Sequence, residues 1–324
     1  TLRSVSGVPD RVIAELGDVC TANAIRHLGI VGALHEVAAL FDEAELRWLA
    51  MKGPVLSALY YDDIGDRGYS DLDLLVDHRD FSAAVRLLEA AGYRSAFKDW
   101  RLAERMLIGQ LEMCRGSVRI DLHWQLHYDC DVRRPYGFRP HEMIGRRRRV
   151  VVSGAEVPTF DAVDTIVTLS FHAARSGGHS LVWSKDLERV LAADRIDPVE
   201  VVRVSRSARC GPAVGVMLAR ARDLLGAPVP GEVVEQLLPA PLSLLERVAG
   251  VVSPCVPVDD GSSGAVSRFV MRSIGPSTGG SVTAIPARTR RRLSRRFRPP
   301  AAHDTDDPVE KASFLRAVAA APDG

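Results

Sequence analysis

The sequence predicts an α+β fold, in which a small mixed sheet with packed helices is followed by a helical C-terminal domain. Up to about residue 160, short apolar runs alternate with amphipathic helical segments, and beyond it the apolar spacing is mostly helical. The chain has 324 residues, which is enough for two modest domains. We expect N-terminal helices over 1–45, the sheet core over 46–160, a helical domain over 161–255, and a tail rich in Gly, Pro and Arg over 256–324.

The first elements follow from local patterns. Residues 10–42 place apolar side chains at helical spacing, which predicts one or two amphipathic helices. Residues 46–53 form a short apolar run typical of a buried strand, and Pro54 suits the first turn of a following helix. Residues 71–76 are again short and apolar and are bounded by turn residues, so they predict a second strand.

The next segments complete the predicted sheet. Residues 79–93 indicate a helix with one apolar stripe, which Gly92 ends. Residues 109–126 predict two strands joined by a Gly-Ser turn, and residues 146–160 predict a hairpin. After a run of helical segments, the basic stretch RTRRRLSRRFRPP at 288–300 has little apolar content, so we expect the last forty or so residues to be largely disordered.

Composition narrows the class of protein. The chain carries 42 basic and 41 acidic residues, so its net charge of +1 does not favour nucleic acid or a membrane surface as a partner. The five cysteines are widely spaced without a CxxC pair, which argues against a zinc site or a disulfide framework and favours reduced thiols in a cytoplasmic protein. The apolar stretch LGIVGALHEVAAL at 28–40 is broken by His35 and Glu36 and is too short to span a bilayer.

Two aspartates interrupt the predicted strand at 71–76. Side chains alternate in a strand, so Asp71 and Asp73 point to one face while the leucines between and after them point to the other. Neighbouring carboxylates repel unless a cation lies between them, and Mg²⁺ is the cation that such oxygen ligands commonly hold. Asp121 is a third carboxylate in an apolar strand, and it would join the other two if the strands are neighbours. The alternative interpretation is a salt-bridged or edge strand face for the first pair and a structural role for Asp121.

The turn before the second predicted helix offers groups that could bind phosphate. Lys52 is one of only four lysines, and Gly53 permits close approach of the backbone at a helix N-terminus. Arg67 lies four residues before Asp71, and a guanidinium matches phosphate oxygens. A plain strand-to-helix turn with a solvated lysine, and a solvated loop arginine, are the alternatives.

These residues together resemble a known family. The segment LRWLAMKGPVLSALYYDDIGDRGYSDLDLLVDHRDFSAAVRLLEAAGY, followed by VRIDLHWQL, is similar to the uncharacterised bacterial nucleotidyltransferase-like family of the DNA polymerase β superfamily. The matching features are the Lys-Gly turn, the Arg-x-x-Ser-Asp-Leu-Asp strand, the helix ending in Gly-Tyr, and the Asp-Leu-His-Trp strand. The resemblance covers roughly residues 20–225 and excludes the tail.

The resemblance implies a polymerase β-type nucleotidyltransferase core and roles for particular residues. It implies that Asp71, Asp73 and Asp121 bind Mg²⁺ (or Mn²⁺), with Asp121 also helping to deprotonate the acceptor hydroxyl. It implies that Lys52, Gly53, Arg67 and Ser70 bind the nucleotide. The wider superfamily has Gly-Ser where this chain has Lys52-Gly53, so a serine hydroxyl is missing here and Lys52 could supply charge instead.

Several other polar residues could reach the same site. His123 follows Asp121 on the same strand face, and it suits either a substrate contact or a structural role. Lys185 and Asp186 begin a predicted helix and could contact substrate between the domains, although Asp186 also suits the helix dipole without any such role. His172 lies among apolar neighbours in a helix and is interpreted as structural.

We therefore expect a Mg²⁺-dependent nucleotidyltransferase that moves a nucleoside monophosphate from ATP or another NTP to a hydroxyl acceptor and releases pyrophosphate. A small molecule or a protein side chain is the favoured acceptor. One alternative is a catalytically inactive nucleotide-binding subunit with a regulatory or assembly role. Another is an enzyme that modifies RNA ends, with nucleic acid bound through the basic tail.

Overall fold

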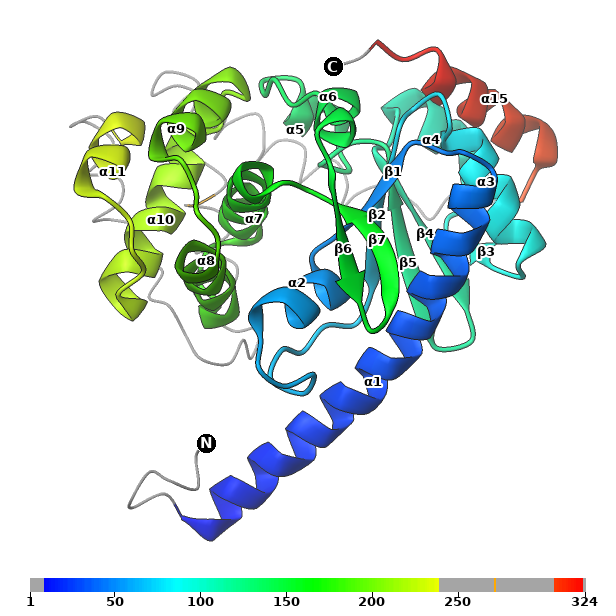
Figure 1. The fold of residues 1–324 in the computed structure, drawn as a ribbon. Helices are drawn as coiled ribbons and strands as arrows, with labels where there is room; N and C mark the ends of the chain where they lie inside the picture. The colour runs from blue at the N-terminus through cyan, green and yellow to red at the C-terminus, as the bar shows by residue number, and fades with distance from the viewer. Residues whose placement is uncertain (1–8, 239–270, 272–305, 323–324) are drawn as a thin grey trace, which may run out of the picture.

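A seven-stranded mixed sheet organises the part of the chain that the computed structural model describes, residues 9–238, 271 and 306–322 (Figure 1). The strand order is β3-β4-β5-β2-β1-β7-β6. Strand β2 pairs antiparallel with β1 and parallel with β5, and β1 pairs parallel with β7. The remaining neighbours are antiparallel. The strands are β1 (Trp48–Met51), β2 (Leu72–Val76), β3 (Arg94–Ser95), β4 (Gln110–Arg115), β5 (Val118–His123), β6 (Arg148–Val152) and β7 (Ala155–Thr159).

Helices cover both faces of this sheet (Figure 1). The helices up to the second hairpin are α1 (Asp10–Glu43), α2 (Gly53–Tyr60), α3 (Phe81–Ala90), α4 (Trp100–Met106), α5 (Cys130–Arg133) and α6 (Pro140–Gly145). After the sheet follow α7 (Ala162–Ser176), α8 (Leu181–Ala193), α9 (Pro198–Ser207), α10 (Gly211–Leu225) and α11 (Gly231–Leu237), and then α15 (Pro308–Ala319). The predicted α+β class with a helical C-terminal part is confirmed.

Alternation along the strands produces two separate cores. Leu72, Leu74 and Val76 of β2 pack with α1, α3, α4 and α15 on one face. Leu75 packs on the other face with α2 and the helices α7 to α11. Because Asp73 shares the face of Leu75, its carboxylate is directed toward the helical part of the molecule.

Some elements were not predicted. The segment between α3 and β4 contains the two-residue strand β3 and the helix α4, whose N-cap Asp99 accepts a hydrogen bond from the Leu102 N–H. Within the tail expected to be irregular, α15 forms because Phe314, Leu315 and Val318 lie on one face and are buried against α3 and α4. The basic run 288–300 lies outside the described residues.

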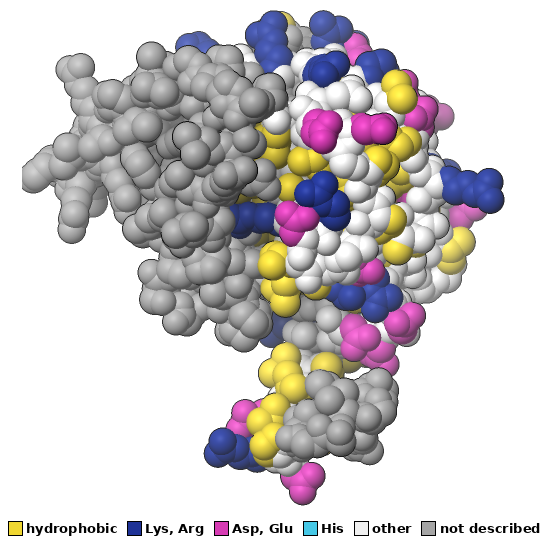
Figure 2. All heavy atoms as spheres, turned by 90° about the vertical axis from the view of Figure 1, so that its left-hand side faces the viewer, with side chains coloured by type: hydrophobic (Ala, Val, Ile, Leu, Met, Phe, Trp, Pro, Cys, Tyr) yellow, Lys and Arg dark blue, Asp and Glu magenta, His cyan; other side chains and the backbone are white. Residues whose placement is uncertain are grey.

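Helix α1 continues beyond the body of the molecule. Its C-terminal half is buried against the sheet, whereas its first turns expose Leu16 and Val19. Figure 2 shows this end standing away at the bottom of the view with hydrophobic side chains on its surface. Among the described residues, α1 is the one helix whose length and composition would allow it to cross a membrane, and 44% of its most apolar stretch is buried.

Candidate functional site

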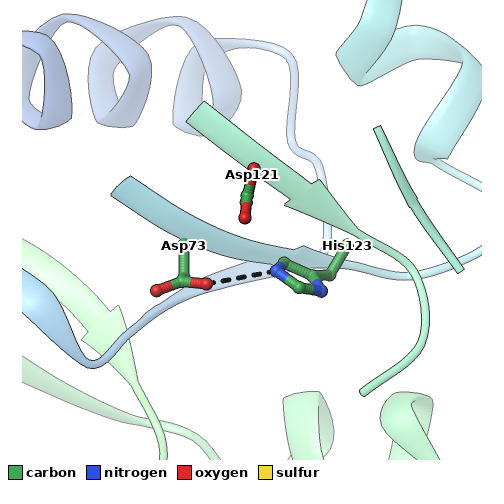
Figure 3. A group of neighbouring side chains, drawn as sticks. All are labelled: Asp73, Asp121 and His123. Carbon is green, nitrogen blue, oxygen red and sulfur yellow. Dashed lines mark hydrogen bonds and ion pairs between the residues drawn. The ribbon is translucent and has the colours of Figure 1, made fainter. Parts of the chain in front are cut away.

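The centre of the site is set by the register between two parallel strands. Asp73 in β2 lies directly opposite Asp121 in β5. His123 follows two residues later on the same face of β5, and the three side chains converge in front of the sheet (Figure 3). On the opposite face of both strands, Leu72, Leu74, Ile120 and Leu122 are fully buried. The apolar alternation therefore fixes the register that brings the two carboxylates together.

The three side chains form a group that could hold a metal ion. One ligand atom from each of Asp73, Asp121 and His123 lies within 4.8 Å of the others, and this is the one such group found within the described residues. The Nε2 atom of His123 is 3.2 Å from Oδ1 of Asp73, and Gln110 donates a hydrogen bond to Asp121 Oδ2 at 3.3 Å. Two carboxylate oxygens suit a hard divalent cation such as Mg²⁺.

Asp71 lies one residue before β2 and lines the same cavity without joining that group. Its Oδ2 atom is 3.6 Å from Nη2 of Arg119. Arg119 also donates a hydrogen bond to the Ser70 hydroxyl at 3.1 Å, and Ser70 does not line the cavity. The predicted pair of aspartates is thus divided between the centre of the site and its edge.

Lys52 supplies a positive charge at the centre. It lies in the turn between β1 and α2 with a φ of 41°, a value that residues other than glycine seldom adopt. Gly53 follows with a φ of 37°. The turn directs the Lys52 ammonium toward Asp73, with Nζ 3.1 Å from Oδ1. Strain of this kind is common at functional sites, where surrounding structure maintains it.

The carboxyl groups differ in their acidity. Burial alone would raise the pKa of Asp73, but the charge of Lys52 and the hydrogen bond from His123 outweigh it and hold the pKa well below its ordinary value. Burial and the neighbouring carboxylates raise the pKa of Asp71 and of Asp121. A divalent cation at this place would stabilise the ionised form of both. Asp71 and Asp121 are therefore both readier than Asp73 to accept a proton.

A buried ion pair connects the site to the helical part. Arg67 donates from Nε and Nη2 to the two carboxylate oxygens of Asp186 on α8, at 2.7 and 2.8 Å. Tyr61 donates its hydroxyl to the same carboxylate at 2.7 Å. Both side chains of the ion pair are buried, at 8% and 1% relative exposure. The loop that carries Arg67 is therefore fastened to α8.

The Arg67–Asp186 pair and the group formed by Asp73, Asp121 and His123 line one cavity of about 360 Å³. Its walls come from the β1–α2 turn, the loop before β2, strands β4 and β5, and helices α7 and α8. Of the predicted site residues, the cavity is lined by Lys52, Gly53, Arg67, Asp71, Asp73, Asp121, His123 and Asp186. The structure does not place Ser70 or Lys185 there, and the Lys185 ammonium instead lies 3.0 Å from Glu188.

Other cavity residues were missed or given another role from the sequence. His172, interpreted as structural, lines the cavity from α7, and the charge of Lys52 is the main cause that lowers its pKa to about 3. Tyr69, Gln110 and Trp183 also line it. Gln110 could have been anticipated, because it begins the strand paired with β5, whereas the helical residues have no such signal in the sequence.

A sequence family and a solved structure are similar to parts of this chain. A family model described as uncharacterised nucleotidyltransferase matches residues 2–226. The solution structure of the antibiotic-resistance factor ANT(2'')-Ia is similar, with 15% sequence identity and a TM-score of 0.31 over 61% of this chain and 93% of that chain. At these values the likeness does not extend to substrates or residue roles. A comparison with curated proteins found no match.

Proposed function

Because this chain belongs to the uncharacterised nucleotidyltransferase family, we propose that it transfers a nucleoside monophosphate from an NTP to a hydroxyl acceptor and releases pyrophosphate. The observation that carries the proposal is the register that sets Asp73 beside Asp121 on the face of the sheet that lines the cavity. The roles of the site residues, the identity of the metal and the direction of nucleotidyl transfer belong to the same proposal.

The metal would be Mg²⁺ or Mn²⁺, held by Asp73 and Asp121 with Asp71 close by. Bound there, it would neutralise charge on the triphosphate and favour ionisation of the acceptor hydroxyl. His123 orients Asp73 through the 3.2 Å contact. Asp121, ionised beside the metal, would be the carboxylate that accepts the hydroxyl proton.

The positive groups would bind the triphosphate. Lys52 and Gly53 begin α2, and a helix N-terminus favours phosphate. Lys52 would add its charge to this effect. Arg67 lines the cavity while it remains paired with Asp186, so its contribution is to position the turn and to add positive potential.

The reaction can be written with its bonds balanced. The acceptor oxygen attacks the α-phosphorus and forms a new P–O bond, while the bond from the α-phosphorus to the bridging oxygen breaks. Pyrophosphate leaves with that electron pair, and the hydroxyl proton passes to Asp121. Alignment of the two substrates and neutralisation of charge would provide most of the rate enhancement.

Thermal unfolding with each NTP, with and without Mg²⁺, tests the proposal. A ligand present at 100 times its Kd stabilises the native state by about 2.7 kcal/mol, which raises Tm by several degrees. We expect a rise in Tm that needs both metal and one NTP. The rise should disappear in Asp121→Asn and persist in Asp18→Asn, a matched change on the exposed part of α1.

A second candidate function has its own observation. Lys52 and His123 both contact the Oδ1 atom of Asp73, which would suit a nucleotide-binding subunit without transfer activity. In that case an NTP would raise Tm without Mg²⁺, and Asp121→Asn would leave the rise unchanged. No rise with any NTP would contradict both candidates.

A further inference from the structure

A second cavity of about 350 Å³ adjoins the first. The two share the side chains of Leu126, His127 and Phe171 as a common wall. This wall begins directly after β5, the strand that carries Asp121 and His123. A molecule in the second cavity would therefore lie next to the metal-binding group.

The common wall is held firmly in place. The Gly109 N–H donates to the Tyr128 carbonyl at 2.8 Å, and the Trp124 N–H donates to the Gly109 carbonyl at 3.0 Å. The Trp124 indole donates to the Ile108 carbonyl at 2.7 Å. A β-carbon at position 109 would lie 2.3 Å from the His127 carbonyl oxygen, so only glycine fits there. The segment that carries Leu126 and His127 follows β5 outside the sheet, and these hydrogen bonds fix it against the residues that precede β4.

The lining of the second cavity is aromatic. Phe171 contacts Phe138 and Tyr136, with ring centroids 4.7 and 4.8 Å apart. Trp124 closes another side with its ring under Arg133, whose guanidinium carbon is 4.8 Å from the ring centroid. Aromatic walls of this kind favour a flat apolar ligand, which can stack on them or meet their edges.

The charge of the second cavity is opposite to that of the first. Arg133 and Arg134 line it, and none of the described residues that line it is an aspartate or a glutamate. The first cavity contains Asp71, Asp73, Asp121 and Asp186. Among the described residues that line the second cavity, a cationic acceptor would meet no opposite charge, whereas a carboxylate or phosphate would meet two guanidinium groups.

We propose that the second cavity binds the acceptor, and that the acceptor is a small hydroxyl compound with an aromatic or similarly flat body and an anionic group. This inference rests on the proposed function for the reaction that follows binding. The acceptor's body would lie among Phe138, Phe171 and Tyr136, with its anionic group toward the arginines. Its hydroxyl would be directed past the common wall, so that its oxygen attacks the α-phosphorus and its proton passes to Asp121.

A series of three probes that differ in charge tests the ligand class. We would measure binding of 4-hydroxyphenylacetate (anionic), 4-hydroxyphenylacetamide (neutral) and tyramine (cationic) to the full chain by ligand-observed NMR and calorimetry, without nucleotide. We expect the anionic compound to bind at least ten times more tightly than tyramine. Equal or tighter binding of tyramine, or no binding of the anionic compound at millimolar concentration, would overturn the inference.

Substitutions then locate the binding. Arg134→Gln and Arg133→Gln/Arg134→Gln should reduce the affinity for the anionic probe about tenfold or more and leave that for the neutral probe nearly unchanged. Arg195→Gln, an exposed arginine outside the cavity, should not change either affinity. Arg134 is exposed, so its single variant keeps the test valid if the loss of the Arg133–Trp124 contact disturbs folding. Unchanged affinity in both arginine variants would also overturn the inference.

The outcomes separate this inference from the proposed function. If Tm rises with Mg²⁺ and NTP but the probes show no charge preference, the nucleotidyltransferase proposal stands and the proposed class of acceptor is wrong. If the probes show a charge preference that depends on the arginines but NTP does not change Tm, the proposed class of ligand stands and the proposed nucleotidyl transfer is wrong.

Discussion

Lys52 places a positive charge that affects several ionisable groups of the candidate site. Its ammonium contacts Asp73 at 3.1 Å, and its charge is the main cause of the low pKa of His172. The turn that places it has a backbone conformation unusual for a lysine. Substitution of Lys52 should therefore change the behaviour of groups on two different elements, Asp73 on β2 and His172 on α7.

The titration of His172 measures this effect. With a pKa of about 3, its imidazole is neutral at pH 6, where an ordinary histidine is largely protonated. Between pH 6.5 and 3 the unfolded chain binds a proton that the folded chain does not, so this group makes stability fall as pH falls through that window. We expect Lys52→Met to raise the pKa of His172 by at least one unit, measured by NMR of the ring C–H signals. The same pKa in wild type and variant would contradict the assignment of Lys52 as the cause.

The Arg67–Asp186 pair gives a second prediction at this scale. Asp186→Ala would leave the Arg67 charge buried without its partner, which should lower the free energy of unfolding by about 3–5 kcal/mol. Arg67→Met/Asp186→Leu should recover most of that loss, because no charge remains buried. Urea unfolding of Arg67→Met, Asp186→Leu and the double variant measures the coupling. Additive effects would show that the two side chains do not stabilise each other.

The sequence predicted some of these residues and not their partners. Strand alternation was enough to predict that Asp71 and Asp73 face the same way, since it depends only on local periodicity, whereas the approach of Asp121 depended on β2 and β5 being neighbours. The partner of Arg67 is 119 residues away on a helix, and no local pattern encodes how α8 packs against the loop. Lys185 and Asp186 are neighbours in sequence, yet only Asp186 reaches the cavity, because adjacent helix residues point in different directions.

At the scale of elements, Gly109 controls how the segment after β5 meets β4. A β-carbon there would lie 2.9 Å from Gln125 Cβ as well as close to the His127 carbonyl. Gly109→Ala should therefore lower the free energy of unfolding by about 1–3 kcal/mol and displace the wall common to both cavities. Urea unfolding and a crystal structure would measure the two effects.

Gly17→Ala is the matched control for that prediction. Gly17 lies within α1 with no atom near its β-carbon position, so alanine should stabilise the helix by about 0.5–1 kcal/mol. A loss of stability in the control equal to that of Gly109→Ala would mean that the steric explanation is wrong.

Elements with a distinct apolar run or stripe were predictable, and those without one were not. Helix α3 and strands β1, β2, β4 and β5 agree with the predicted segments, because each is an apolar run or stripe next to turn residues. Strand β3 has two residues and α4 has seven, and so few residues cannot establish a period. Their stability comes instead from β4 and from the contact of α4 with α15.

At the scale of the whole molecule, α15 is distant in sequence from the sheet but packs into the core beside it. Phe314 is fully buried between Phe81 and Trp100, with ring centroids 6.5 and 6.0 Å away. Lys311 adds an ion pair with Glu89. The sequence analysis did not anticipate this helix, since its apolar residues follow a long polar stretch.

Phe314→Ala should destabilise the whole protein and not only its end. Removing a buried phenylalanine costs about 3–5 kcal/mol of unfolding free energy, and Trp100 would lose a neighbour. We expect a matching fall in the urea midpoint followed by tryptophan fluorescence. Val309→Ala, on the exposed side of α15 at 72% exposure, should change the unfolding free energy by less than about 0.5 kcal/mol. Equal effects of the two substitutions would show that α15 does not belong to the core.

The register between β2 and β5 also determines what misfolding would do to the candidate site. A slip of one residue would turn Asp121 and His123 into the apolar layer and bring Ile120 and Leu122 to the cavity. The same slip would disrupt the packing against α1 and α3. A chain that lacked the carboxylate group for this reason would therefore also be misfolded. The same strand register therefore completes the apolar core and brings Asp73 and Asp121 together. A correctly folded molecule necessarily has the two carboxylates side by side.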